Sequence, residues 1–310
     1  MKICSLLPSA TEIVCSLGLE DQLVGISHVC DYPESVLKSD AVIITRRSSD
    51  LSGLSSQKID EIIKFNREQK IATQIVDGDL LKKISPDVIL TQELCYVCAV
   101  EYGAVCEITL DILDYQPKIV SLKPAGIQDI LNNILLIADA CDVIDEGNRV
   151  VDSIQTRIDF ISKTLAQSNY KKGPKTFCID WLNPLRNTGQ WIPELIELAG
   201  GNEGLAEKNG KSREVSWSEV VDYDPDFIFS MPCAFPMYEV DSASRLAFSE
   251  VEQFNEINAV KKDQVYLFDG QIPSRHGPRF IDVLENFAAV MYPELFNSLF
   301  NTGMYTKYSL

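Results

Sequence analysis

The nine cysteines and two histidines are the side chains of this 310-residue chain with the greatest capacity for chemistry. Cys95 and Cys98 are separated by two residues, a spacing found in redox pairs and in one half of a zinc site. A closed zinc site usually needs a second such pair, and only the isolated Cys30, Cys106 and Cys233 are available. We therefore interpret these thiols as buried or ligand-lining groups, with metal or redox chemistry as the alternative.

A second reading of the same residues is catalytic. A Cys–His–Asp hydrolase could be drawn from Cys95, His28 and Asp31, but neither a sharp nucleophile-bearing turn nor a glycine-rich oxyanion loop surrounds Cys95. No phosphate-binding loop, dinucleotide fingerprint or metalloprotease helix motif appears in the sequence. Binding without catalysis is the favoured interpretation, and an enzyme acting on a metal chelate through Cys95 or His28 is an alternative.

Short apolar runs alternate with amphipathic stretches along the whole chain. The runs are residues 2–7, 23–27, 41–45, 71–76, 88–91, 118–122, 176–180, 227–231 and 265–268. Alternation of strands and helices predicts largely parallel sheets covered by helices on both faces. Because 310 residues exceed one typical domain, we predict an α/β fold of two three-layer lobes.

A long helix is predicted between the two lobes, from about Glu146 to Gln167. Its apolar residues are spaced by threes and fours, at Val151, Ile154, Ile158, Ile161 and Leu165. About 20 helical residues span roughly 30 Å, which is long enough to connect two lobes. The predicted boundaries are 1–141 for the first lobe, 142–169 for the connecting helix and 170–310 for the second lobe.

The two halves also resemble one another locally. Residues 85–91 read Ser-Pro-Asp before an apolar run, and residues 224–230 read Asp-Pro-Asp before another. A Pro-Asp pair in this place is typical of a helix end that leads into a buried strand. Chance similarity of a common turn is the alternative to two lobes of similar build.

In open α/β sheets, ligands bind at the carboxyl ends of the strands, so the loops that follow the predicted strands are the candidate site. Both histidines and two of the three tryptophans fall in these loops. The tryptophans stand beside Pro or Gly on irregular backbone, where aromatic faces can contact a ligand, although core positions are the alternative. The candidate ligand-binding residues are Ser9, His28, Asp31, Tyr32, Arg47, Gln92, Glu93, Cys95, Trp181, Trp191, Cys233, Phe235, Arg275 and His276.

Composition narrows the compartment and the partners. A formal net charge of −17 argues against nucleic acid, because phosphate binding needs clustered Lys and Arg. No apolar run approaches the roughly 20 residues needed to span a bilayer, and no secretion signal is visible before Pro8. Scattered, odd-numbered cysteines fit thiols kept reduced inside a cell. We therefore predict a cytoplasmic protein without membrane insertion, with an extracytoplasmic location as the alternative.

Several stretches together resemble the substrate-binding proteins of cobalamin and iron-chelate ABC transporters. They are residues 5–12, 30–33, 85–90, 191–195, 199–202 and 215–220. Residues 91–99, 231–233 and 277–279 are similar to a cobalamin-binding branch of that family. The resemblance implies a class III periplasmic-binding-protein-like fold with a single helical linker. It also implies binding of cobalamin or a related corrinoid in the cleft between the lobes, with no cofactor required. Haem or a siderophore, bound on behalf of an ABC transporter, is the alternative ligand.

The resemblance also implies roles for individual residues. Trp181 and Trp191 would contact the faces of the corrinoid, Arg47 and Gln92 its edges, and His28 or His276 would offer an axial nitrogen to cobalt. A permease of an ABC transporter is a candidate partner, with Asp79 and Glu219 as the acidic docking residues of the two lobes. No tryptophan stands near Arg47, which departs from the family pattern.

Overall fold

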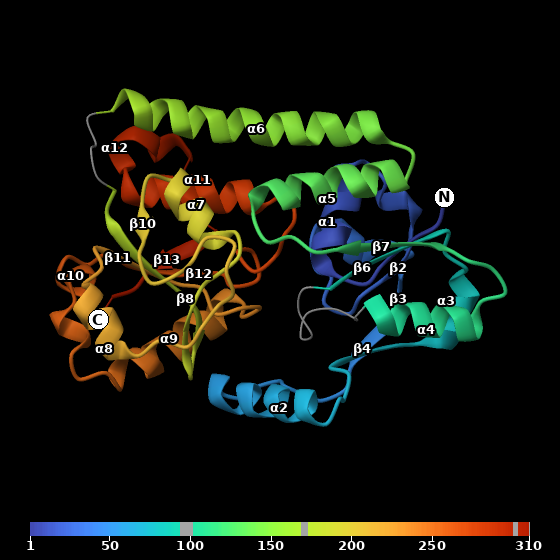
Figure 1. Ribbon diagram of the computed structural model, residues 1–310, viewed down its shortest axis with the longest axis horizontal. Coiled ribbons are helices and arrows are strands. Elements are labelled where there is room, and N and C mark those ends of the chain that lie inside the picture. Colours follow the sequence, from blue (N-terminus) through green and yellow to red (C-terminus); the bar gives the residue numbers. More distant parts are fainter. Residues whose placement is uncertain (94–101, 169–172, 300–302, 310) are drawn as a thin grey trace. The chain divides into compact units, whose positions relative to one another are not determined.

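The computed structural model describes residues 1–93, 102–168, 173–299 and 303–309 as two compact units. Unit 1 comprises Met1–Gly53, Glu61–Pro124 and Gln128–Ser153. Unit 2 comprises Leu54–Asp60, Ala125–Ile127 and Ile154–Leu310. Each unit contains a sheet with helices beside it (Figure 1), which confirms the predicted α/β fold of two lobes joined by a long helix.

Unit 1 is built on a five-stranded parallel sheet in the order β3-β2-β1-β6-β7. Its strands are β1 (Ile3–Ser5), β2 (Leu23–Ile26), β3 (Val42–Ile43), β6 (Val88–Gln92) and β7 (Lys118–Leu122). Every residue of β1 and β6 is buried, as expected for strands covered on both faces. Predicted strand 71–76 does not join this sheet. Its end forms β5 (Gln74–Val76), which pairs antiparallel with β4 (Thr45–Arg47).

Helices cover both faces of the unit 1 sheet. They are α1 (Pro8–Ser16), η1 (Glu20–Gln22), η2 (Glu34–Lys38), α3 (Gly78–Ile84), α4 (Tyr102–Ile112) and α5 (Ile127–Ala140), and α2 (Ser56–Glu68) begins among the residues of unit 2. Cys4 and Ile89 pack with Leu81 of α3 and Val105 of α4 in an aliphatic cluster. Side chains alternate along strands, so the neighbours of Cys4 and Ile89 point to the opposite face.

Unit 2 is built on a six-stranded mixed sheet. The path β10-β8-β11-β12-β13 is parallel except for β13, and β9 pairs antiparallel with β8. The strands are β8 (Lys175–Leu182), β9 (Leu185–Asn187), β10 (Asn202–Glu203), β11 (Phe227–Ser230), β12 (Val265–Phe268) and β13 (Tyr305–Lys307). The helices are α7 (Ile192–Leu198), α8 (Trp217–Tyr223), α9 (Met237–Ser249), η3 (Phe254–Glu256), α10 (Asn258–Lys261), α11 (Phe280–Met291), α12 (Pro293–Phe296) and η4 (Asn297–Leu299).

The core of unit 2 is rich in phenylalanine. Phe229 of β11 stacks on Phe287 of α11 with 5.0 Å between ring centroids. Phe268 of β12 lies 5.1 Å from the Phe287 ring. On the other face, Phe177 and Ile228 pack in a cluster that includes Val220 of α8. The sheet therefore separates two apolar layers, as predicted for a three-layer lobe.

Helix α6 (Ile144–Gln167) runs from unit 1 into unit 2, beginning two residues before its predicted start. Ile154, Ile158 and Ile161 are buried along one face, in agreement with the predicted period. In unit 2, the Arg157 guanidinium donates through Nε to Glu285 of α11 at 2.7 Å, and its Nη2 also contacts Asp282. These hydrogen bonds, led by those that Arg157 donates to Glu285, raise the pKa of Arg157. The predicted lobe boundaries 1–141, 142–169 and 170–310 stay a prediction.

The Pro-Asp stretches form the same turn in both units. In unit 1, α3 ends at Ser85 in the left-handed conformation, and the Asp87 carboxylate accepts the amide of Lys2, which directly precedes β1, at 2.7 Å. In unit 2, α8 ends at Asp224 in the same conformation, and Asp226 accepts the Lys175 amide at 3.0 Å. This helix-to-strand lock explains why both stretches carry the same residue pattern.

Candidate ligand-binding site

His28 lies in the loop after β2 and is held by Thr45. The Thr45 hydroxyl accepts the His28 backbone N–H at 3.0 Å, lies 2.8 Å from His28 Nδ1 and lies 2.9 Å from the Ser27 hydroxyl. Burial, and secondarily the charge of Arg47, lowers the pKa of His28, so the ring is neutral at neutral pH. Nε2 is shielded from solvent and has no hydrogen-bond partner among the described residues. A ligand atom reaches Nε2 only if neighbouring groups move.

The α1 motif near Ser9 is largely structural. Thr11 donates to the Ser5 hydroxyl at 2.8 Å and lies 3.1 Å from Cys30 Sγ, which ties β1, α1 and the loop after β2 together. Ser9 itself is 4% exposed within α1. Much of the predicted motif therefore builds the strand-end loops and offers little surface to a ligand.

The remaining candidate residues of unit 1 differ in exposure. Tyr32 is 45% exposed, Asp31 is half-buried and Arg47 is exposed at the end of β4. Gln92 is buried at the end of β6, whereas Glu93 is exposed. The Glu93 carboxylate accepts from the Ser121 hydroxyl at 3.2 Å and from Lys123 Nζ at 3.3 Å. Cys95 and Cys98 lie outside the described residues.

In unit 2, Trp181 combines a half-buried ring with a fixed polar end. Its Nε1 donates to the Ser56 carbonyl at 3.2 Å, and its ring meets the edge of Phe235 at 5.2 Å. Phe235 is 7% exposed, and Cys233 beside it is half-buried. The Cys233 amide donates to the Asp180 carbonyl at 2.9 Å, which positions this loop at the end of β8.

Trp191 and His276 are core residues in this structure. For Trp191 this is the core position predicted from the sequence as the alternative to a ligand contact. Trp191 is 3% exposed, His276 is 2% exposed, and their rings meet edge to face at 5.8 Å. Trp191 Nε1 donates to the Pro273 carbonyl at 3.0 Å, which joins the start of α7 to the loop before α11. Burial lowers the pKa of His276 to about 4. Neither ring offers a face to a ligand, and half-buried Arg275 is the more accessible residue of that loop.

Two half-buried acids, Asp180 in β8 and Glu203 in β10, were not among the predicted site residues. Burial raises the pKa of Asp180 to about 6 and that of Glu203 to about 8. Glu203 turns its carboxylate inward, where it accepts the Cys178 amide at 2.7 Å. An acid inside the apolar run 176–180 was the available sequence signal for Asp180. Nothing comparable marks Glu203, whose environment is made by chain segments distant in sequence.

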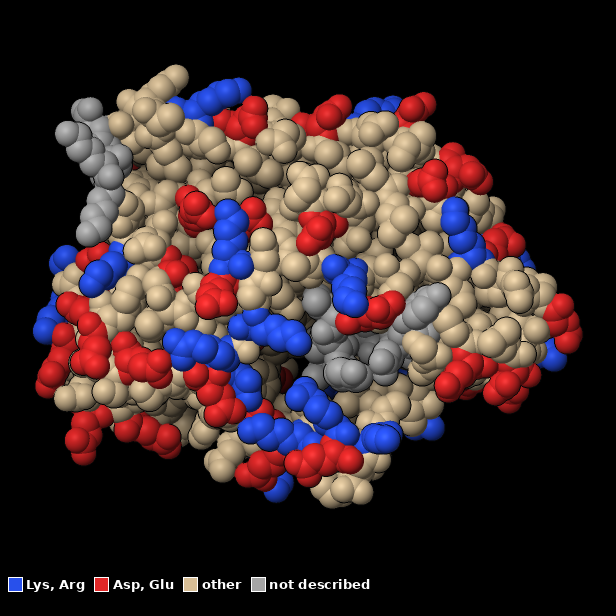
Figure 2. Space-filling model, in the orientation of Figure 1, with Lys and Arg blue, Asp and Glu red and all other residues tan. Residues whose placement is uncertain are grey.

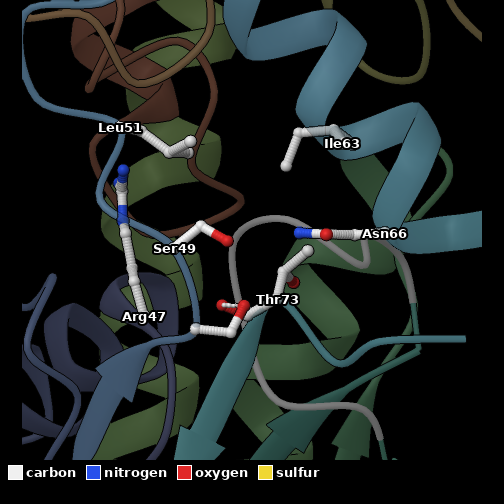
Figure 3. A pocket seen from close by; sticks show the side chains of 7 residues that line it. Arg47, Ser49, Leu51, Ile63, Asn66 and Thr73 are labelled. Atoms are coloured by element: carbon white, nitrogen blue, oxygen red, sulfur yellow. Dashed lines mark hydrogen bonds between the residues drawn. The ribbon is translucent and has the colours of Figure 1, made fainter. Parts of the chain in front are cut away.

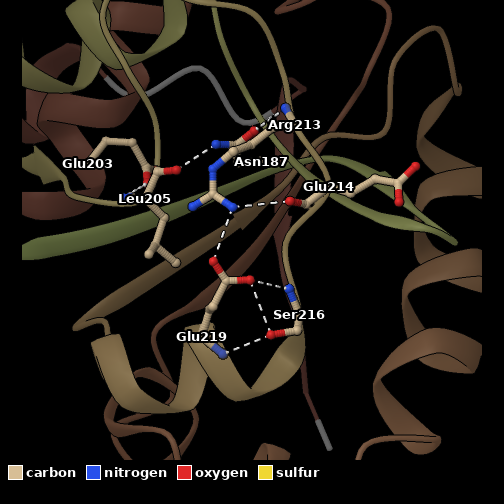
Figure 4. A network of polar contacts seen from close by, with 7 residues as sticks. All are labelled: Asn187, Glu203, Leu205, Arg213, Glu214, Ser216 and Glu219. Atoms are coloured by element: carbon tan, nitrogen blue, oxygen red, sulfur yellow. Dashed lines mark hydrogen bonds and ion pairs between the residues drawn. The ribbon is translucent and has the colours of Figure 1, made fainter.

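A polar network surrounds these acids in unit 2. Asn187 accepts the Arg213 amide at 2.7 Å and donates to the Leu205 carbonyl, so one amide holds two loop segments (Figure 4). Ser212 donates to the Asn187 carbonyl at 2.8 Å. The network fixes the loops that follow β9 and β10.

The two predicted docking acids occupy different positions on equivalent helices. Asp79 is an exposed residue in the first turn of α3, two residues after its N-cap Asp77. Glu219 stands three residues after Ser216, the N-cap of α8, and forms a capping box with it. Its carboxylate also accepts from Arg213 at 3.1 Å. The caps therefore align Asp79 with Ser218, and Glu219 is occupied within its own helix.

Acidic side chains are common on the surface, but the described residues form no metal-binding cluster. Acidic side chains are spread widely over the face shown in Figure 2, in keeping with a net charge of −17. Within residues 1–93, 102–168, 173–299 and 303–309, no group of three or more His, Cys, Asp or Glu side chains is arranged to hold a metal ion. None of the described helices is both long and apolar enough to cross a membrane.

Comparison with known proteins gives matches along nearly the whole chain. Residues 3–272 match the family described as periplasmic binding protein. An uncharacterized ABC transporter substrate-binding lipoprotein of Bacillus subtilis, YvrC, is 23% identical over 301 residues, which are 95% of this chain and 81% of that protein. The vitamin B12-binding protein of Vibrio cholerae is 23% identical over 289 residues, 92% of this chain and 86% of that protein. A periplasmic heme binding protein from Pseudomonas aeruginosa aligns with a TM-score of 0.70 and 16% identity, covering 100% of this chain and 98% of its own.

These matches show that the predicted cytoplasmic location is wrong. The matching family is one of periplasmic proteins, and the Bacillus subtilis protein is a lipoprotein. The prediction of location from cysteine content failed because burial in the fold, as well as a reducing compartment, can keep thiols unpaired. Cys4, Cys141 and Cys178 are free thiols that the fold buries.

Proposed function

We propose that this chain, which belongs to the periplasmic binding protein family, delivers cobalamin or a related corrinoid to an ABC transporter permease. The observation that carries the proposal is the similarity to vitamin B12-binding proteins over 92% of the chain. Members of the family are substrate-binding proteins, so the chain is not an enzyme, and the catalytic alternative through Cys95 or His28 is set aside. No cofactor is needed for binding of this kind.

Accessible aromatic rings would contact the faces of the corrinoid. A corrinoid is a wide, largely apolar disc with amide groups at its edge, so it suits aromatic walls and scattered polar groups. Tyr32 in unit 1 and Trp181 in unit 2 have the required exposure. Trp191 would contribute indirectly, because its Nε1 holds the loop that carries Arg275. Arg47 and Gln92 remain proposed edge contacts, together with Ser9, Asp31, Glu93, Cys95, Cys233 and Phe235.

Coordination of cobalt by the protein would require movement. Neutral imidazole is a common metal ligand, and protonation competes with coordination. His28 keeps Nε2 without a partner among the described residues, whereas His276 is fixed beside Trp191. We therefore favour His28 over His276 as the axial nitrogen. Asp79 and Glu219 remain the proposed acids for docking to a permease, with Asp79 the more accessible of the two.

Haem is the second candidate ligand. Proteins hold haem iron through His or Tyr side chains, and unit 1 places exposed Tyr32 and neutral His28 in the same loop. The heme binding protein of Pseudomonas aeruginosa shares the fold along the whole chain. Haem differs from a corrinoid in its iron centre and its anionic side groups.

Calorimetric titration of the purified protein with cobalamin, cobinamide, haem and a ferric siderophore tests the proposal. We expect a corrinoid to bind with a Kd near 1 μM or tighter, about −8 kcal/mol. Tight binding of another chelate, with no binding of either corrinoid, would refute the ligand assignment and leave the family membership intact. Mass spectrometry of ligand released from the purified protein provides an independent check.

A further inference from the structure

A small pocket of unit 1 opens beside Arg47, where β4 ends. It is lined by Arg47, Ser49, Leu51, Ile63, Asn66 and Thr73, all within unit 1 (Figure 3). Its enclosed part measures about 10 Å³, room for roughly one water molecule. The enclosed part therefore admits about one oxygen of a larger group, whose remainder would lie in the open mouth of the pocket, and it excludes a corrin or porphyrin ring.

Asn66 is the residue of this pocket whose polar side chain points to a ligand-binding role. Helix α2 places Ile59, Ile62 and Ile63 on one side, and the next position of that period is Asn66. Asn66 is 4% exposed and is the buried residue of α2. Its side-chain amide forms no hydrogen bond within the described part of the chain and lines the open pocket, so its NH₂ group can donate to a ligand that enters there. Figure 3 shows this amide directed into the pocket toward Ser49.

Arg47 supplies the positive charge. Its side chain is exposed and forms no ion pair with the described acids, in a chain whose net charge is −17. The closest acid in sequence is Asp50, whose pKa is lowered first by the Ser52 amide and more weakly by Arg47. Asp50 accepts that amide at 3.0 Å, so its carboxylate is held within its own turn.

The donors that line this pocket match one class of ligand. The Arg47 guanidinium, the Asn66 amide NH₂ group and the Ser49 hydroxyl can donate hydrogen bonds, and a guanidinium suits the oxygens of a carboxylate or phosphate especially well. Leu51 and Ile63 complete the wall and limit the access of water, which strengthens a charged contact. A bound water would satisfy Asn66 but would leave Arg47 without a counter-charge.

We propose that this pocket binds an oxyanion, a carboxylate or phosphate group, with Arg47 as its counter-charge and Asn66 as its buried hydrogen-bond donor. The lining residues of the site lie wholly in unit 1. Its occupant is either a free anion or an anionic arm of the transported ligand.

Nuclear magnetic resonance titration of the full chain with inorganic phosphate and with acetate tests the site. We expect saturable shifts of the Asn66 side-chain amide and of Arg47 Nε–H. Arg47→Gln should weaken phosphate binding by about tenfold, the loss of one charge-assisted contact. Arg46→Gln is the matched control, because it makes the same charge change at the next residue of β4 without lining the pocket. It should change affinity by less than about twofold, as expected for long-range charge alone.

A second pair of variants separates the pocket from general electrostatic attraction. Asn66→Asp replaces the donor by a carboxylate of the same shape and should abolish binding, and Ser49→Ala should weaken it without altering charge. Equal effects of Arg46→Gln and Arg47→Gln would overturn the proposal. So would the absence of saturation up to about 100 mM phosphate, beyond which binding is too weak to be specific. If Asn66→Asp does not fold, Ser49→Ala and the arginine pair still decide the question.

Two corrinoids distinguish the sources of the oxyanion. Cobalamin contains a phosphodiester, and cobinamide lacks it. If the ligand supplies the group, Arg47→Gln weakens cobalamin binding by a larger factor than cobinamide binding, because only cobalamin loses the phosphodiester contact in addition to the edge contact. If the occupant is a free anion, phosphate binds as well to the cobalamin-loaded protein as to the empty protein. Should no corrinoid bind at all, the proposed function fails, and the phosphate titration still tests the pocket.

Discussion

The two units share one backbone device and differ in what packs around it. Both hold the first strand of the sheet through an aspartate that follows a short helix, Asp87 in unit 1 and Asp226 in unit 2. The described core cluster of unit 1 is aliphatic, whereas unit 2 stacks phenylalanines such as Phe229 and Phe287. The comparison teaches that backbone locks fix the topology, while core and loop residues are free to diverge.

The largest effect should come from the aromatic core of unit 2. Phe287→Ala removes a fully buried ring that contacts Phe229 and Phe268, so we expect a loss of about 3–5 kcal/mol in the free energy of unfolding. All three tryptophans lie in unit 2, so tryptophan fluorescence during urea unfolding reports on that unit. Tyr238→Ala, at a ring of the same unit that is 72% exposed, should change stability by less than about 0.5 kcal/mol. Similar losses for both variants would contradict the importance of the stacked core.

A smaller effect should separate the aromatic ligand contacts from structural tryptophans. Trp181→Leu should weaken cobalamin binding by about 2 kcal/mol, as expected when a desolvated aromatic anchor is lost. Trp217→Leu is the control, because Trp217 is also half-buried but packs on Phe248 and Phe254 in the core. Calorimetry at matched folded concentrations should show unchanged affinity for that variant. Equal losses in both would remove Trp181 from the proposed site.

The two aspartate locks should differ in strength. Asp226 is partly buried and also accepts from the Asn258 side chain at 2.6 Å, so Asp226→Ala should cost about 2 kcal/mol. The Asp87 hydrogen bond is exposed, and Asp87→Ala should cost about 1 kcal/mol. Urea unfolding monitored by circular dichroism measures both. A larger loss for Asp87→Ala would reverse the inferred order of the locks.

A dependence of stability on pH should also arise in unit 2. Because the pKa of Glu203 is raised to about 8, the folded state holds a proton that the unfolded state releases near its ordinary pKa of about 4.3. Stability from this group is therefore present below about pH 4 and declines as pH rises to about 8, by at most about 1.4 kcal/mol per pH unit. Glu203→Gln should flatten the fluorescence-detected stability curve between pH 5 and pH 8 in urea titrations. An unchanged slope in the variant would show that Glu203 is not protonated in the fold.

The sequence predicted the architecture well because periodicity reports burial within one element. The apolar spacing of α6 and the runs of the parallel strands appear in the structure within a few residues. Strand 71–76 was placed in the wrong sheet because pairing depends on partners distant in the chain, here β4. Location was wrong because cysteine content does not reveal which thiols the fold buries.

The site could be predicted only in part. Strand-end loops were identified from general topology, but the burial of Trp191 and His276 depends on their contact with one another across separate loops. Asn66 was missed, although a polar residue at an apolar position of the α2 period was a visible signal. Glu203 could not be found, since its pKa depends on burial beside Cys178 of another strand.

Helix α6 continues without a break from one unit into the next. The number of residues in the helix therefore sets the direction in which the chain leaves it. Each residue of an α-helix turns the chain by about 100° and advances it by about 1.5 Å. One inserted residue would thus twist everything that follows Arg157 by more than a quarter turn, while seven would restore the angle to within about 20°. Insertions and deletions in this family should therefore be rare within the helix and should accumulate at the loops instead.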